Sequence, residues 1–223
     1  MKAILVPIVS AVLLLSACGT QTPASRSASD LTVAPQTQRT AAAGDVRQVL
    51  TTQYNVVDVK ISVPKTLRVS EANMFYPIAD IVWRGEPMGD RYAQVTSIYK
   101  EAATKAKAGM TKGQSVVVEL EVTRFHCVTE KTRYTIGGTH SLHFLMTVRD
   151  ATSGAVIDGP RGVNADVKAA GGALAVAEEQ MGRTQRVVVV ERLADVIKRE
   201  LSQRVTDPLV VSRALTAQDS VTN

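Results

Sequence analysis

The sequence contains little cysteine, histidine or aromatic residue. Its 223 residues include two Cys, three His, three Phe and one Trp. Two cysteines are too few for a disulfide framework. The Lys and Arg residues are scattered without a basic block, and few aromatic side chains accompany them. This lacks the pattern of a nucleic-acid-binding protein, so we expect no nucleic-acid partner.

Catalytic and phosphate-binding motifs are also missing. The sequence has no Gly-x-Ser-x-Gly elbow. In the stretch AGMTKGQS, Lys112 precedes Gly113 and a strand is expected to follow, unlike in a P-loop. No His–Asn or His–Asp relay can be assigned to Cys127, and Glu119 and Glu121 have the spacing of a solvated strand face. We therefore expect neither an enzyme nor a cofactor.

The N-terminus has the pattern of an export signal. Lys2 is followed by an apolar run and by small residues before Cys18. The run is too short for a spanning helix, so we expect residues 1–17 to be removed. The stretch Leu-Ser-Ala-Cys at 15–18 resembles the lipobox of bacterial lipoproteins, whose cysteine sulfur takes a diacylglyceryl group before its new amine is acylated. An ordinary secretory signal with an incidental cysteine is the alternative.

The lipobox resemblance implies lipidation of Cys18 and a protein anchored to a membrane without spanning it. Cys127 would then be a single unpaired thiol. Gly19 rather than Asp after the cysteine implies sorting to the outer membrane, facing the periplasm, in a cell with two membranes. Removal of Lys2 leaves 25 of the 26 Lys and Arg against 21 Asp and Glu, a net charge of +4. This small excess favours a slightly basic solvated surface.

The rest of the chain divides by composition. Residues 18–44 contain much Thr, Ser, Ala and Gln and almost nothing large and apolar, so we expect a lipidated cysteine followed by a flexible tether. Residues 45–205 are long enough for one domain with a sizeable core. Residues 206–223 are expected to form a C-terminal tail.

The spacing of apolar residues predicts six elements in the domain. Val57, Val59, Ile61 and Val63 are expected to face inward from the first strand, and Trp83 is expected to anchor the core. The predicted order is strand 54–63, helix 90–108, strand 115–128, strand 140–150, a strand within 156–167 and helix 184–201. This order predicts an α+β fold with two helices packed on one face of a mostly antiparallel sheet.

The second and third strands should pair antiparallel, with their even-numbered apolar residues facing inward. The expected pairs are Val118 with Val148, Leu120 with Met146, Val122 with Phe144, Arg124 with Leu142, and His126 with His140. His126 and His140 would then share one end of the sheet, while Cys127 and His143 would point to the other face. Because these side chains diverge, we expect no metal site, and His126 and His140 remain the nearest candidates for one.

Four stretches resemble an uncharacterised lipoprotein family of α-proteobacteria, a domain-of-unknown-function family. They read DIVWRGEPMGDRYAQV, TRFHCVTEKTRYTIGGTHSLHF, TVRDATSGAVIDGP and AEEQMGRTQ. The order of elements more loosely resembles small lipoproteins that assist envelope assembly or serve transporters. These resemblances imply an accessory protein with an envelope partner. A lipid-binding or apolar-ligand-binding protein, with the ligand between sheet and helices, is the alternative. The oligomeric state stays open.

Overall fold

The computed structural model describes residues 49–205. The expectations for residues 1–17, 18–44 and 206–223 lie outside this range. The elements are β1 (Val49–Thr52), β2 (Tyr54–Ser62), β3 (Ile81–Val82), α1 (Arg91–Lys107), β4 (Gln114–His126), α2 (Glu130–Arg133), β5 (Gly138–Asp150), β6 (Val156–Asn164), β7 (Val167–Ala169), α3 (Gly172–Gln180), α4 (Gln185–Glu200) and β8 (Ser202–Val205).

The main sheet has six strands built around the two long strands β4 and β5. β2 and β3 both run parallel to β4, beside different parts of it, and β6 and β7 both run antiparallel to β5. β4 and β5 are antiparallel to each other. The sheet is therefore mixed and mostly antiparallel. The parallel pairing of β2 with β4 requires a crossover connection, and this connection contains α1.

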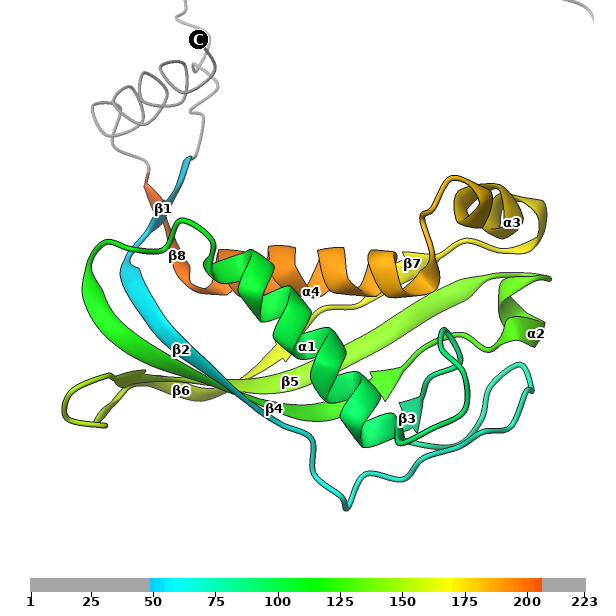
Figure 1. The fold of residues 1–223 in the computed structure, drawn as a ribbon, viewed down its shortest axis with the longest axis horizontal. Coiled ribbons are helices and arrows are strands. Elements are labelled where there is room, and N and C mark those ends of the chain that lie inside the picture. The colour runs from blue at the N-terminus through cyan, green and yellow to red at the C-terminus, as the bar shows by residue number, and fades with distance from the viewer. Residues whose placement is uncertain (1–48, 206–223) are drawn as a thin grey trace, which may run out of the picture. The chain divides into compact units, whose positions relative to one another are not determined.

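The helices α1 and α4 pack on one face of the sheet (Figure 1), which confirms the predicted α+β fold. Asp90 caps α1 by accepting hydrogen bonds from the backbone N–H groups of Tyr92 and Ala93. Thr184 caps α4 in the same way, through Val187. The short helices α2 and α3 were not predicted, so the helix count differs from the expectation. No helix within residues 49–205 combines the length and apolar character needed to cross a membrane.

The core lies between the sheet and the helices α1 and α4. Trp83 is completely buried, as predicted. Its ring meets Phe125 edge-on at a centroid distance of 5.6 Å, and Tyr99 meets Phe144 edge-on at 5.7 Å. Such edge-to-face pairs add to the stabilisation from burial. These four large side chains fill the centre of the space that the helices cover.

The register of β4 and β5 is as predicted up to Phe144 and differs beyond it. Val122 lies opposite Phe144, but an extra residue in β4 then places Arg124 opposite His143. This β-bulge reverses the alternation, so that Phe125 enters the core opposite Leu142. The predicted pairs of Arg124 with Leu142 and of His126 with His140 are therefore wrong. An unbroken register would have placed Phe125 in water and Arg124 in the core.

A second β-bulge, in β2, changes which side chains of the first predicted strand face the core. The register of β2 against β4 shifts between Val56 and Asp58. Val56 is buried and Val57 is 48 % exposed, so the expectation that Val57 faces inward is wrong. Val59 and Ile61 pack against the core as predicted.

Candidate functional site: the open face of the sheet

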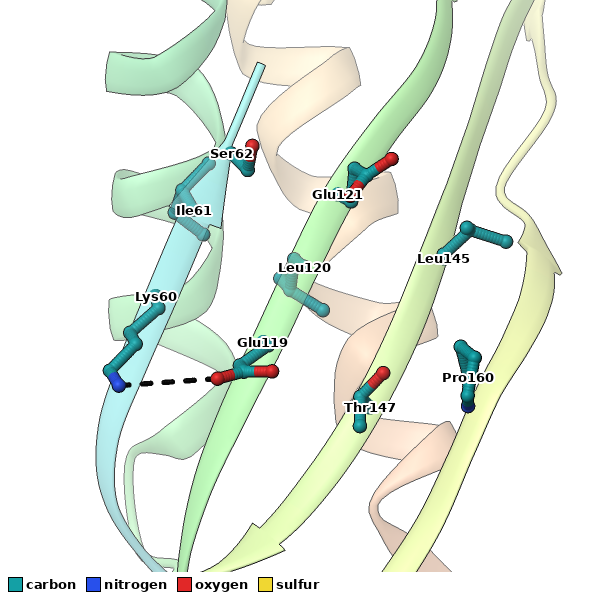
Figure 2. A pocket seen from close by; sticks show the side chains of 9 residues that line it. All are labelled: Lys60, Ile61, Ser62, Glu119, Leu120, Glu121, Leu145, Thr147 and Pro160. Carbon is teal, nitrogen blue, oxygen red and sulfur yellow. Dashed lines mark ion pairs between the residues drawn. The ribbon is translucent and has the colours of Figure 1, made fainter. Parts of the chain in front are cut away.

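One face of the main sheet is left open by α1 and α4. Figure 2 looks onto this face, with the strands in front and the helices behind them. We call the outward side chains of β2, β4, β5 and β6 the open face. Three hollows follow one another along it, and the outward residues of β5 contribute to each: Thr147 and Leu145 to the first, Leu145 and His143 to the second, and Ser141 and Thr139 to the third.

The first hollow, of about 270 Å³, lies across β2, β4, β5 and β6 (Figure 2). Glu119 stands between two cations, with its Oε1 3.9 Å from Lys60 Nζ and its Oε2 2.8 Å from Arg149 Nε. Glu121 projects from the same side of β4. Within the described part of the chain, Glu121 has no ion pair. Leu145 adds an apolar side chain, so this hollow combines a neutralised carboxylate, an unpaired one and an apolar wall.

The second hollow, of about 250 Å³, continues from Leu145 to His143 and Asn164. His143 is partly exposed, and its Nε2 lies 3.1 Å from Asp166 Oδ1. The same oxygen of Asp166 accepts a hydrogen bond from the backbone N–H of Leu142 at 2.8 Å. Asp166 thus links the end of β6 to the outward side of β5.

The third hollow, of about 470 Å³, is the largest of the three, and we call it the Tyr76 pocket. It lies at the end of the sheet near α2. Its apolar wall consists of Phe75, Tyr76, Val128 and Ile136, and its polar lining includes His126, Thr139, Ser141 and Asp166. Tyr76 and Ile136 are 65 % and 75 % exposed, which is unusual for large apolar side chains that lie close together.

Buried hydroxyl groups hold the backbone that carries Phe75 and Tyr76. Thr129 donates to the carbonyl of Met74, and Thr132 donates to the carbonyl of Phe75, both at 2.8 Å. His126 adds a third contact, from its Nε2 to the Pro77 carbonyl at 2.8 Å. The backbone of the aromatic segment is thus fixed at three points while its side chains stay exposed.

The glycine pair in the stretch IGGTH serves a tight turn beside this pocket. Gly137 has φ +69°, and a Cβ there would lie 2.7 Å from the Ala169 carbonyl oxygen. Its backbone N–H is already bonded to the Thr132 carbonyl at 2.8 Å. Only glycine fits this close approach of two chain segments.

The histidines singled out in the sequence do not form one site. His126 and His143 lie on the open face, whereas His140 is buried on the core side of β5. The expectation that Cys127 shares a face with His143 is wrong, because the bulge turns Cys127 into the core with Phe125. In residues 49–205 no three His, Cys, Asp or Glu side chains are grouped so that they could hold a metal ion.

Two of the buried groups have strongly shifted pKa values. Burial lowers the pKa of His140 to about 4, assisted by the positive charge of Arg133. Neither ring nitrogen of His140 has a hydrogen-bond partner in the structure. Burial raises the pKa of the Cys127 thiol, against a hydrogen bond with Gln185 that lowers it. Cys127 is therefore a protonated thiol at neutral pH and a poor nucleophile.

Sequence patterns did not predict most of the residues that line the hollows of the open face. The alternation of Glu119 and Glu121 with buried residues correctly indicated a solvated strand face. The Tyr76 pocket had no such signal, because it combines the segment around Phe75, the end of β4, the turn at Gly137 and Asp166. These segments meet only in the folded chain.

A family model, DUF6778, described as a family of unknown function, matches residues 54–217. No curated protein sequence matches the chain. Among solved structures, a protein of the family DUF330 from Xanthomonas campestris is 11 % identical, with a TM-score of 0.40 over 77 % of this chain and 89 % of that one. A minor lipoprotein from Acinetobacter baumannii is 12 % identical, with a TM-score of 0.33 over 66 % of this chain and 97 % of that one.

Proposed function

The chain belongs to DUF6778, a family of unknown function, and we propose that it is a lipid-anchored envelope protein that holds a protein partner on the open face of its sheet. The observation that carries this proposal is the asymmetry of the sheet. Helices cover one face, while the other has two neighbouring hollows across its strands, with the Leu145 side chain in both.

The chemistry of the open face suits binding better than catalysis. Glu119 is neutralised by Lys60 and Arg149, and Asp166 is engaged by His143. The mixture of apolar hollows and fixed charges resembles a binding surface, where apolar anchors supply affinity and polar groups set orientation. We therefore propose a non-catalytic accessory role.

The first and last strands of the described residues lie at one end of the domain. β1 pairs antiparallel with β8, and this two-stranded ribbon lies at the end of the domain away from α2 (Figure 1). Cys18 and the tether lie outside the described residues, so lipidation, the outer-membrane location and the membrane attachment are parts of the proposal.

For an apolar ligand, the interior between sheet and helices offers little space. Tyr99, Phe125 and Phe144 are buried there with Trp83, and each is at most 1 % exposed. We therefore place the proposed partner site outside this interior, on the open face.

The proposal is tested by site-specific photocross-linking in the intact cell envelope. A photoreactive amino acid at Glu121 or Leu145 would lie in the first hollow, and one at exposed Lys100 on α1 would serve as the control. We expect one discrete cross-linked protein from both open-face positions and none from Lys100. Equal cross-linking from all three positions, or none, contradicts the proposal.

A further inference from the structure

The Tyr76 pocket has the size and lining of a site for a small apolar ligand. Its volume of about 470 Å³ falls within the range of about 300–1,000 Å³ that is usual for ligand pockets. Phe75, Tyr76 and Ile136 form the apolar wall, and each is at least half exposed. Burying these side chains against a ligand would remove apolar surface from water, which favours binding.

The pocket is arranged in advance of binding. The ring of Tyr76 lies against that of His126 with centroids 4.6 Å apart, and His126 is itself held by the Pro77 carbonyl. The Thr129 and Thr132 hydroxyls fix the backbone on either side of Phe75. A ligand would therefore not have to order this segment, which lowers the entropic cost of binding.

Two cations stand against the aromatic wall. Lys131 Nζ lies 4.7 Å from the centroid of the Phe75 ring, and Arg124 Nη2 donates to the Tyr76 hydroxyl at 2.8 Å. Arg124 also donates from Nε to Ser141 Oγ, a second neutral partner. Neither cation has an ion pair within residues 49–205. The charge of Lys131 is therefore available to an anion at the edge of the pocket, and Arg124 adds a second positive charge that also acts on Asp80.

The acidic residues near the pocket already have partners. Asp166 is held by His143 and by the backbone N–H of Leu142. Asp80, whose pKa is lowered chiefly by a backbone hydrogen bond from Arg68, also pairs with the Arg68 side chain at 3.5 Å. Asp166 is the one acidic side chain in the described lining of the pocket, and the two positive charges of Lys131 and Arg124 exceed its single negative charge.

We propose that the Tyr76 pocket binds an anionic amphiphile, with its hydrocarbon chain against Phe75, Tyr76 and Ile136 and its anionic head group at Lys131 and Arg124. This inference goes beyond the proposed docking function, because it concerns a ligand at the end of the sheet and not the partner on its strands. The shared chemistry of such ligands is an alkyl chain ending in a carboxylate or phosphate.

The test is calorimetric titration of residues 18–223 carrying Cys18→Ser, a chain without acyl groups of its own. Decanoate is the probe, and 1-decanol is its uncharged counterpart. We expect saturable one-to-one binding of decanoate and weaker binding of decanol. Ile136→Glu should weaken decanoate binding by about tenfold or more, because it replaces part of the apolar wall by a carboxylate.

Two further variants make the test specific. Lys131→Glu should weaken decanoate binding several-fold and leave decanol binding unchanged. Ile78→Glu is the matched control, because Ile78 lies in the same segment as Tyr76, is 84 % exposed and does not line the pocket. It should bind decanoate like the unchanged chain. All three side chains are exposed, so the substitutions should leave the fold intact.

Three results would overturn the proposal. The first is no saturable binding of decanoate, and the second is equal weakening by Ile136→Glu and Ile78→Glu. The third is sedimentation with phosphatidylglycerol vesicles without binding of free decanoate, which would indicate recognition of a membrane surface. None of these results affects the cross-linking from Glu121 and Leu145, so the two proposals fail separately.

Discussion

Arg91 and Glu71 form a two-point ion pair at the start of α1. The guanidinium Nε and Nη2 lie 2.5 and 2.7 Å from the two carboxylate oxygens, and the Arg91 residue is only 4 % exposed. The third nitrogen of Arg91 donates to the carbonyls of Glu86 and Pro87. This pair therefore ties the segment after β2 and the loop before α1 to the helix.

Glu71→Ala should destabilise the protein by about 1–3 kcal/mol, because a buried guanidinium loses its carboxylate. Urea unfolding at pH 7 measures the change. Glu191→Ala is the control, since its pair with Arg183 is exposed on both sides and should contribute less than about 1 kcal/mol. Equal effects of the two substitutions would show that the Arg91–Glu71 pair contributes no more to stability than an exposed ion pair.

The destabilisation caused by Glu71→Ala should also depend on pH. The hydrogen bond from Arg91 lowers the pKa of Glu71 in the folded protein. The pair therefore stabilises the fold above the unfolded pKa of about 4.3, and this contribution is lost as pH falls through the folded pKa. The difference between the unchanged chain and Glu71→Ala should shrink below pH ~4, whereas a purely steric effect would stay constant.

His140→Leu should stabilise the protein in acid. The pKa of His140 is lowered from 6.5 to about 4, so protonation favours the unfolded chain as pH falls between these values. The stability that depends on neutral His140 is complete above pH 6.5 and lost toward pH 4, a loss of about 2–3 kcal/mol. Leucine removes both the titration and the two unpaired ring nitrogens.

Denaturant unfolding at pH 7.5 and pH 4.5 measures this difference. His143→Leu is the control, because the His143 side chain is partly exposed and its Nε2 has a polar partner, Asp166 Oδ1 at 3.1 Å. We expect the acid-induced loss of stability to be smaller in His140→Leu only. An unchanged pH dependence in that variant would contradict the buried, unpaired state of His140.

Phe144→Ala should cost about 3–5 kcal/mol of unfolding free energy, because it leaves a cavity beside Tyr99 in the core. Phe75→Ala, at a half-exposed phenylalanine, should cost less than about 1 kcal/mol. Both values come from urea unfolding. A change below about 1 kcal/mol for Phe144→Ala would place this side chain outside the core.

Cys18→Ser should abolish membrane attachment and leave an uncut precursor, because serine cannot form the thioether that precedes cleavage. Cell fractionation after a high-salt wash, with immunoblotting for the precursor, measures both effects. Cys127→Ser is the control for a cysteine that carries no lipid. A Cys18→Ser protein that stays in the membrane fraction would show that the lipobox interpretation is wrong.

Local patterns in the sequence predicted the two long helices, α1 and α4. They also predicted the pairing of β4 with β5 as far as Val122 and Phe144. Asp90 and Thr184 are caps that act within three residues of themselves, and the apolar stripes of α1 and α4 repeat within a few turns. The alternation that pairs Val118 with Val148 is likewise local to each strand. α3 lacked such a signal, since Gly171 at its N-cap has no capping side chain.

The bulges, the parallel pairing and the binding surface were decided by tertiary structure. The extra residue beyond Val122 lets Phe125 reach Trp83 and Tyr99, which lie far away in the sequence. That single shift separates His126 from His140 and turns Cys127 inward. The sequence by itself determined which residues prefer burial and helical or extended backbone, because those preferences are local. Packing between distant segments decided which faces of the helices and the sheet came together and which hollows stayed open. At the β4 bulge, filling the core stabilised the fold more than an unbroken strand alternation would have done.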